Sequence, residues 1–154
     1  MNKKYELERI ISDEGDIFAD DNLFRIRAVR DIPEVGVHAG ELGGVVSGSG
    51  NLSHQGFCWI TYDAMAIEAA RVTGNALIRD HAVVAENARV GDNATVADMA
   101  NVTLQGVVDG NATVCGSAIV TGDAHVGGYA IVDGQCKIDG TSILIVEYNT
   151  QGVE

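Results

Sequence analysis

Residues 58–147 consist of fifteen consecutive copies of a six-residue repeat. From Ala76 onward, successive copies read A-L-I-R-D-H, A-V-V-A-E-N and A-R-V-G-D-N. Eleven copies begin with Ala, and the third residue is Val, Ile or Leu in every copy except the one that holds Ala66. A fixed period of this length indicates a fold built from stacked copies of one small unit, each contacting its neighbours.

Each copy has the pattern of a short strand followed by a corner. The first and third residues are small or apolar and share one side of an extended segment, so the second and fourth residues point the other way. Gly, Asp and Asn are frequent at the fifth and sixth positions, where they tolerate the positive φ of a tight turn. A helix is disfavoured, because a six-residue period does not stay on one helix face and each Gly would cost about 1 kcal/mol.

The segments V-T-G-N-A-L at 72–77 and V-G-D-N-A-T at 90–95 resemble the hexapeptide repeat of left-handed parallel β-helix proteins, the trimeric LpxA-like superfamily. In that family three hexapeptides form one triangular coil, so the resemblance implies that residues eighteen apart stack. The predicted fold is all-β: a left-handed parallel β-helix of about five to six coils with an N-terminal β-hairpin cap. Segments 40–44, 51–56 and 59–60 resemble a narrower group, the uncharacterised YdcK-like proteins of bacteria and phages.

Three parts of the chain are predicted: an N-terminal capping region with an irregular first coil (1–57), the hexapeptide helix (58–147) and a short tail (148–154). The tail is too short to form a capping helix of normal length. No apolar run suits a secretory signal or a membrane span. We therefore expect a cytoplasmic protein that does not contact membranes.

The capping region contains two segments with alternating apolar residues, at 5–11 and 23–29. These predict a hairpin that covers the first coil, because the open end of a β-helix exposes a row of unpaired backbone groups. The spacing is six residues from Val46 to Leu52 but eight from Leu52 to Ile60. This difference predicts a partial first coil with a two-residue insertion.

Stacking in triangular coils gives three outward faces, and the second of these is the most apolar. Its outward positions predict a subunit interface formed by Met65, Ile67, Val83, Ala85, Asn101 and Ile119. The last hexad is also apolar at the outward positions Ile143 and Ile145, which we add to the predicted interface. We expect a homotrimer, with this last edge covered inside the trimer, by end-to-end packing of two trimers, or by the tail 148–154.

The formal net charge of −12 disfavours direct binding to nucleic acid. It is compatible with two interpretations, a solvated surface that aids solubility and a protein partner with a basic surface. The three cysteines are expected to be reduced thiols. Cys58 and Cys136 occupy inward positions, whereas Cys115 occupies an outward one.

Asn75, Asn93 and Asn111 follow one another at intervals of eighteen residues and should stack at one corner. The structural interpretation is an Asn ladder that satisfies corner backbone groups, since Asn readily adopts the left-handed conformation. The functional alternative is a row of amides that binds a ligand.

The sequence predicts no catalytic residue set, no metal site and no cofactor. The nearest approach to a catalytic site is His125, which should lie beside Asp109 of the preceding coil, so that a carboxylate could orient a general base. His81 and His125 fall on different coils and different sides, which excludes the closely spaced histidines of a metal site. Phosphate-binding and dinucleotide-binding motifs are absent.

The favoured function is a non-enzymatic assembly or binding protein, including a phage or prophage accessory protein that binds and blocks a host factor. Two alternatives remain open. One is an acyl-CoA-dependent enzyme similar to hexapeptide acyltransferases, with a site between subunits. The other is a small-ligand binder that uses grooves between subunits.

Overall fold

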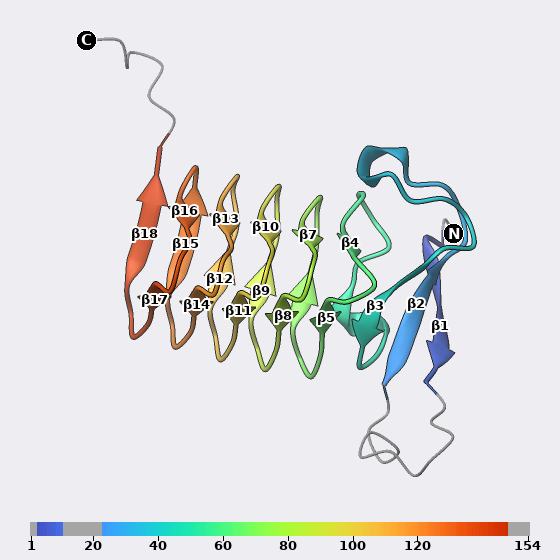
Figure 1. The fold of residues 1–154 in the computed structure, drawn as a ribbon, viewed down its shortest axis with the longest axis horizontal. Coiled ribbons are helices and arrows are strands. Elements are labelled where there is room, and N and C mark those ends of the chain that lie inside the picture. The colour runs from blue at the N-terminus through green and yellow to red at the C-terminus, as the bar shows by residue number, and fades with distance from the viewer. Residues whose placement is uncertain (1–2, 11–22, 148–154) are drawn as a thin grey trace.

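The computed structural model describes residues 3–10 and 23–147 and shows a parallel β-solenoid of about six turns (Figure 1). The described strands form three sheets, one for each side of the coil. The predicted all-β, parallel helical fold of five to six coils with an N-terminal hairpin is confirmed. The left-handed winding stays a prediction from the family resemblance.

The cap-bearing sheet has the order β1-β2-β3-β5-β8-β11-β14-β17. Its strands are β1 (Tyr5–Arg9), β2 (Phe24–Ala28), β3 (Leu42–Val46), β5 (Met65–Ala66), β8 (Val83–Val84), β11 (Asn101–Val102), β14 (Ile119–Val120) and β17 (Lys137–Ile138). The Trp59 sheet contains β4 (Trp59–Ile60), β7 (Leu77–Ile78), β10 (Thr95–Val96), β13 (Thr113–Val114) and β16 (Ile131–Val132). The His125 sheet contains β6 (Arg71–Val72), β9 (Arg89–Val90), β12 (Val107–Val108), β15 (His125–Gly128) and β18 (Ile143–Val146). Two short 3-10 turns, η1 (Pro33–Val35) and η2 (Ser49–Asn51), lie before the regular coils.

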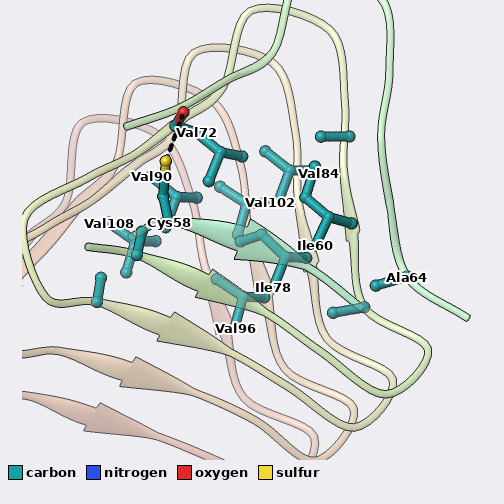
Figure 2. Close-up of a cluster of buried hydrophobic side chains, with 14 of the residues drawn as sticks. Cys58, Ile60, Ala64, Val72, Ile78, Val84, Val90, Val96, Val102 and Val108 are labelled. Carbon is teal, nitrogen blue, oxygen red and sulfur yellow. Dashed lines mark hydrogen bonds between the residues drawn. The ribbon is translucent and has the colours of Figure 1, made fainter. Parts of the chain in front are cut away.

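Equivalent residues of successive coils pair in register, as Leu77, Thr95 and Thr113 do in the Trp59 sheet. The Ala side chains at the first position and the Val or Ile side chains at the third fill the inside of the coil, where most are completely buried (Figure 2). The stacked backbones are joined by amide-to-carbonyl hydrogen bonds from each coil to the next. The hexad pattern therefore predicted the core correctly.

The fifth residue of each hexad turns the corner in the left-handed conformation, with φ between 53° and 68° from Glu68 to Gly140. In the early coils this residue is mostly acidic, and its carboxylate accepts a hydrogen bond from the backbone amide eighteen residues ahead. The acceptors are Glu68, Asp80, Glu86, Asp92 and Asp98. Five of the eleven acidic residues in the repeat thus have a structural role. Later coils use Gly, which adopts this conformation without strain.

The N-terminal cap continues one sheet of the solenoid. β1 and β2 pair antiparallel, β2 and β3 pair antiparallel, and β3 pairs parallel with β5 of the first regular coil. Both hairpin strands were predicted, although the end of the first at Ile11 lies outside the described residues. Gly44 is required where β3 crosses the first corner, because a Cβ there would lie 2.4 Å from the carbonyl oxygen of Ala64.

The predicted insertion in the first coil is also present. Val46 pairs with Ala66 and Leu52 with Val72, which are partners twenty residues apart in each case. Ile60 pairs with Ile78, eighteen residues ahead. The two extra residues therefore lie between Leu52 and Ile60, in the segment that turns across the N-terminal end of the coil.

The C-terminal end has no equivalent of the cap among the described residues. β16, β17 and β18 are each the last strand of their sheet. Cys136, which the hexad pattern placed inside the coil, is exposed, while Cys58 at the same hexad position is fully buried. An inward position therefore leads to burial only where another coil or the cap is stacked on that side.

Candidate functional sites

The His125–Asp109 pair predicted from the sequence is present on the His125 sheet. Nε2 of His125 lies 2.8 Å from Oδ1 of Asp109, and both side chains are about one third exposed, at 34% and 35%. Gly127 makes the room for this contact, since a Cβ at that position would lie 2.6 Å from Oδ1 of Asp109. Gly127 does not have the positive φ of the corner glycines, so the close approach of Asp109 is the reason for glycine at this position, and no local pattern predicts it.

A shallow groove of about 440 Å³ runs along the same sheet below the pair. Its lining includes Arg71, Thr73, Arg89, Gly91 and Asp109. The two arginines pair in register and make no ion pair within the described chain. Sequence analysis did not single out this groove, which depends on stacking of positions eighteen apart.

The chemistry available at His125 is that of a base oriented by a carboxylate. A catalytic base also needs a site that holds the substrate and excludes water. The described coils from β4 to β18 follow one another without an inserted loop, so none of these segments closes over His125. The geometry of the pair alone therefore identifies no active site.

The predicted subunit interface lies on the outward side of the cap-bearing sheet. Met65, Val83, Asn101 and Ile119 form one column, in register along β5, β8, β11 and β14. All four are half-buried in the single chain, and Ala85 beside them is buried. Their neighbours on the sheet therefore cover part of this apolar surface already.

Asn75, Asn93 and Asn111 were predicted to stack at one corner of successive coils. Two of these side chains form hydrogen bonds there. Oδ1 of Asn75 accepts the backbone amide of Phe57, and Nδ2 of Asn75 donates to Oδ1 of Asn93 at 3.3 Å. None of the three has positive φ. The left-handed residue is the one before each Asn, so the conformational argument for the ladder was wrong, although two of its members are linked.

The two most exposed large apolar side chains among the described residues, Ile143 and Ile131, lie near the C-terminal end, and the next, Met99 at 64%, lies in the middle of the stack. Ile131 is 68% exposed, Ile143 71%, Ile145 48% and Val146 44%. The inward residues Ile138 and Leu144 of the last coil are only half-buried. This end combines three strand edges with the open interior of the coil, and it includes the two predicted interface residues Ile143 and Ile145.

The N-terminal end contains a buried polar cluster that sequence analysis missed. Lys4 is completely buried, and its Nζ donates to the carbonyl oxygen of Cys58 at 2.7 Å and contacts Sγ of Cys58 at 3.2 Å. The hydroxyl of Tyr5 donates to the backbone of Leu52, and the ring of His54 stacks on Tyr5 at 4.1 Å. Desolvation lowers the pKa of Lys4, while the nearby Cys58 raises it by a smaller amount.

Within residues 3–10 and 23–147, no group of three or more His, Cys, Asp or Glu side chains could hold a metal ion. Nor does this part of the chain contain a helix with the length and hydrophobicity needed to cross a membrane. No protein-family model matches the sequence, and no curated protein matches it either. Clues to function therefore come from the molecule's own surfaces.

Proposed function

We propose that the protein is a non-enzymatic β-helical assembly and binding protein of the left-handed hexapeptide-repeat type. The observation that carries this proposal is the C-terminal coil, where Ile143 and Ile145 are exposed and the inward side of Leu144 is only half covered. Open strand edges with apolar side chains favour pairing with another chain. A contact there would bury apolar surface and occupy the free edges together.

The partner that fits this end best is the same end of a second copy. Lys4 and the hairpin occupy the N-terminal end, so a head-to-tail stack would have to displace them. Among the described residues no element covers the C-terminal end, so two such ends can meet without that change, and a twofold contact of this kind closes on itself. The proposed assembly is therefore tail to tail, with the edge of β18 and its exposed Ile143 and Ile145 included in the contact.

Replacing both Ile143 and Ile145 with Lys tests this contact. We expect the molecular mass in solution to fall by half, because charged side chains would be buried against their own copies. Gln135→Lys with Thr141→Lys is the matched control, since it adds two charges at exposed corners of the same coil. Sedimentation velocity or light scattering measures the mass, and an unchanged mass for the Ile143 and Ile145 variant would contradict the contact.

The tail 148–154 is the competing cover for this end, and it lies outside the described residues. A chain truncated after Glu147 separates the two explanations. A tail-to-tail contact between coils predicts that the truncated chain keeps the parent's assembly state. Truncation that instead creates a larger assembly would show that the tail had occupied the edge.

The homotrimer is the second part of the proposal, supported by the apolar column on the cap-bearing sheet and by the habit of the family that the sequence resembles. Ile119→Glu, in the middle of that column, should dissociate the trimer, because an unpaired charge in a buried interface costs several kcal/mol. Thr113→Glu, a half-buried outward position of the same coil on the Trp59 sheet, is the control. A monomeric parent protein would rule out the trimer.

A protein partner with a basic surface, including a host factor blocked by a phage protein, extends the same proposal. The net charge of −12 gives it limited support, because five of the acidic side chains already accept hydrogen bonds at the corners. Any such partner would be recognised through surfaces that the assembly leaves exposed.

The second candidate function is an enzyme similar to hexapeptide acyltransferases, and the His125–Asp109 contact is the observation that favours it. In that case His125→Ala should abolish transfer from an acyl-CoA while the fold is kept. Under the assembly hypothesis, His125→Ala leaves assembly and any biological activity unchanged. Measuring thioester consumption and molecular mass on the same variant distinguishes the two.

A further inference from the structure

The contact between Lys4 and Cys58 joins an amine to a thiol inside the N-terminal cap. Nζ of Lys4 lies 3.2 Å from Sγ of Cys58, and both residues are fully buried. Lys4 comes from the start of the chain and Cys58 from the first hexad, fifty-four residues later.

Capping the coil explains part of this arrangement. In the regular coils, the carbonyls of the fifth and first hexad residues accept amides of the preceding coil, as Asp92 and Ala94 accept those of Asn75 and Leu77. At the N-terminal end the equivalent carbonyls belong to Gly56 and Cys58, and Nζ of Lys4 donates to them at 3.4 and 2.7 Å. Hydrogen bonding to these end carbonyls therefore explains why an amine is buried at this position.

The sulfur contact is additional to this capping role. The first hexad position is Ala in eleven copies, and an Ala at position 58 would leave the carbonyl contacts of Lys4 in place. The carbonyl oxygens of Ser53 and Val72 lie farther from Sγ than the amine does, at 3.5 and 3.8 Å (Figure 2 shows the contact to Val72). The amine is therefore the nearest reactive neighbour of this thiol.

We propose that Lys4 and Cys58 form a covalent nitrogen–sulfur cross-link when the protein is exposed to hydrogen peroxide. In the first step the sulfur attacks one peroxide oxygen, the O–O bond breaks, and a sulfenic acid and water are formed. In the second step the lone pair of Nζ attacks the sulfur, the S–O bond breaks, and the amine loses a proton as water leaves. The sum is one thiol, one amine and one peroxide giving one sulfenamide and two waters.

The surroundings favour the second step. Only an unprotonated amine is nucleophilic, and desolvation lowers the pKa of Lys4. The amine is already held against the sulfur, so the reaction needs no large movement of the chain. Burial slows the first step, since reactive thiols are usually accessible. We therefore expect Cys58 to be oxidised more slowly than the exposed Cys136.

The product would tie the start of the chain to the first coil. Such a link closes a long loop and restricts the unfolded chain, as a disulfide does. The oxidised protein should therefore unfold at a higher temperature than the reduced protein. Since thiols reduce nitrogen–sulfur bonds, dithiothreitol should reverse the change.

Peptide mapping of the full-length protein after peroxide treatment tests the proposal. The expected product is a pair of peptides joined through Lys4 and Cys58, with a net loss of two hydrogen atoms, and it should disappear after reduction. Cys136 serves as the internal control, because it is exposed and should gain oxygen atoms without joining to a lysine. If Cys58 is oxidised with no link to Lys4, or is still unchanged when treatment is continued long after Cys136 is fully oxidised, the proposal is wrong.

The unfolding temperatures of two variants give a second test that does not depend on peptide mapping. Lys4→Arg keeps a donor for the carbonyls but removes the nucleophilic amine, and Cys58→Ala removes the thiol. Both should lose the peroxide-induced rise in unfolding temperature, whereas Cys136→Ser should keep it. If a variant does not fold, peptide mapping of the unmodified protein alone decides the outcome.

Discussion

The two ends of the solenoid are built from the same hexad but lie in opposite environments. At the N-terminal end Cys58 is fully buried under Lys4 and the hairpin, while at the C-terminal end Cys136, at the same hexad position, is exposed. The inward Ile60 is buried and the inward Ile138 is half-buried. A hexad therefore specifies which way its side chains point, and only a neighbouring coil or cap removes them from water.

The comparison predicts a large difference between equivalent core residues. Ile78→Ala, in the interior of the stack, should reduce the free energy of unfolding by about 2–5 kcal/mol. Ile138→Ala, at the same hexad position of the last coil, should cost about 1 kcal/mol in a single chain, because its side chain is already partly hydrated. Urea unfolding measures both. Equal losses for the two variants would show that the C-terminal coil is as well covered as the interior.

Two corner glycines give a second test with the backbone strain held constant. Gly122 and Gly140 both have positive φ, 68° and 62°. A Cβ on Gly122 would lie 2.9 Å from the amide nitrogen of Gly140, while a Cβ on Gly140 meets nothing within 4 Å. In both Ala variants the strained left-handed conformation should lower the free energy of unfolding by about 1–2 kcal/mol.

Only Gly122→Ala should incur the further cost of a clash with the coil stacked on it, about 1–3 kcal/mol. The difference between the unfolding free energies of the two variants isolates this cost. If Gly140→Ala is the more destabilising of the two, another chain or segment must pack against the last corner in solution.

The last prediction concerns the stability of the N-terminal end at alkaline pH. Desolvation raises the pKa of Tyr5 from its ordinary 10.0 to about 12. Between these values the folded protein keeps a proton that the unfolded chain releases, so stability falls as pH rises through this window. The slope should reach about 1.4 kcal/mol for each pH unit.

Tyr5→Phe should remove this part of the pH dependence. Its unfolding free energy is expected to be lower at neutral pH, because the hydrogen bond to the backbone of Leu52 is lost. The shifted pKa of Lys4 acts in both proteins and cancels in the comparison. Unfolding free energy is plotted against pH for the two proteins. Parallel curves from pH 9 to 12 would mean that the hairpin does not unfold together with the coils.

Several features of the fold followed from local sequence alone. The period of six identified the strands, the corners and the inward residues, since side-chain direction along a strand depends only on position. The change in spacing between Val46, Leu52 and Ile60 located the two-residue insertion. The eighteen-residue stacking that brings His125 beside Asp109 followed from the family resemblance.

Other features depended on contacts between distant residues. The pairing of Lys4 with Cys58 has no local signal, because the two are brought together by the fold of the hairpin. Glu68 and Glu86 adopt the left-handed corner conformation, which their residue type does not favour, with their carboxylates bonded to the next coil. Gly127 is needed because a neighbouring coil places Asp109 against it.

The sequence by itself therefore determined the repeating unit and the direction of each side chain, because both are set by φ, ψ and residue size within six residues. The tertiary structure alone decided which of these side chains are buried, capped or left exposed. Burial and hydrogen bonding between coils require residues eighteen or more positions apart. The contrast between Cys58 and Cys136 shows that identical local patterns acquire different environments from the rest of the chain.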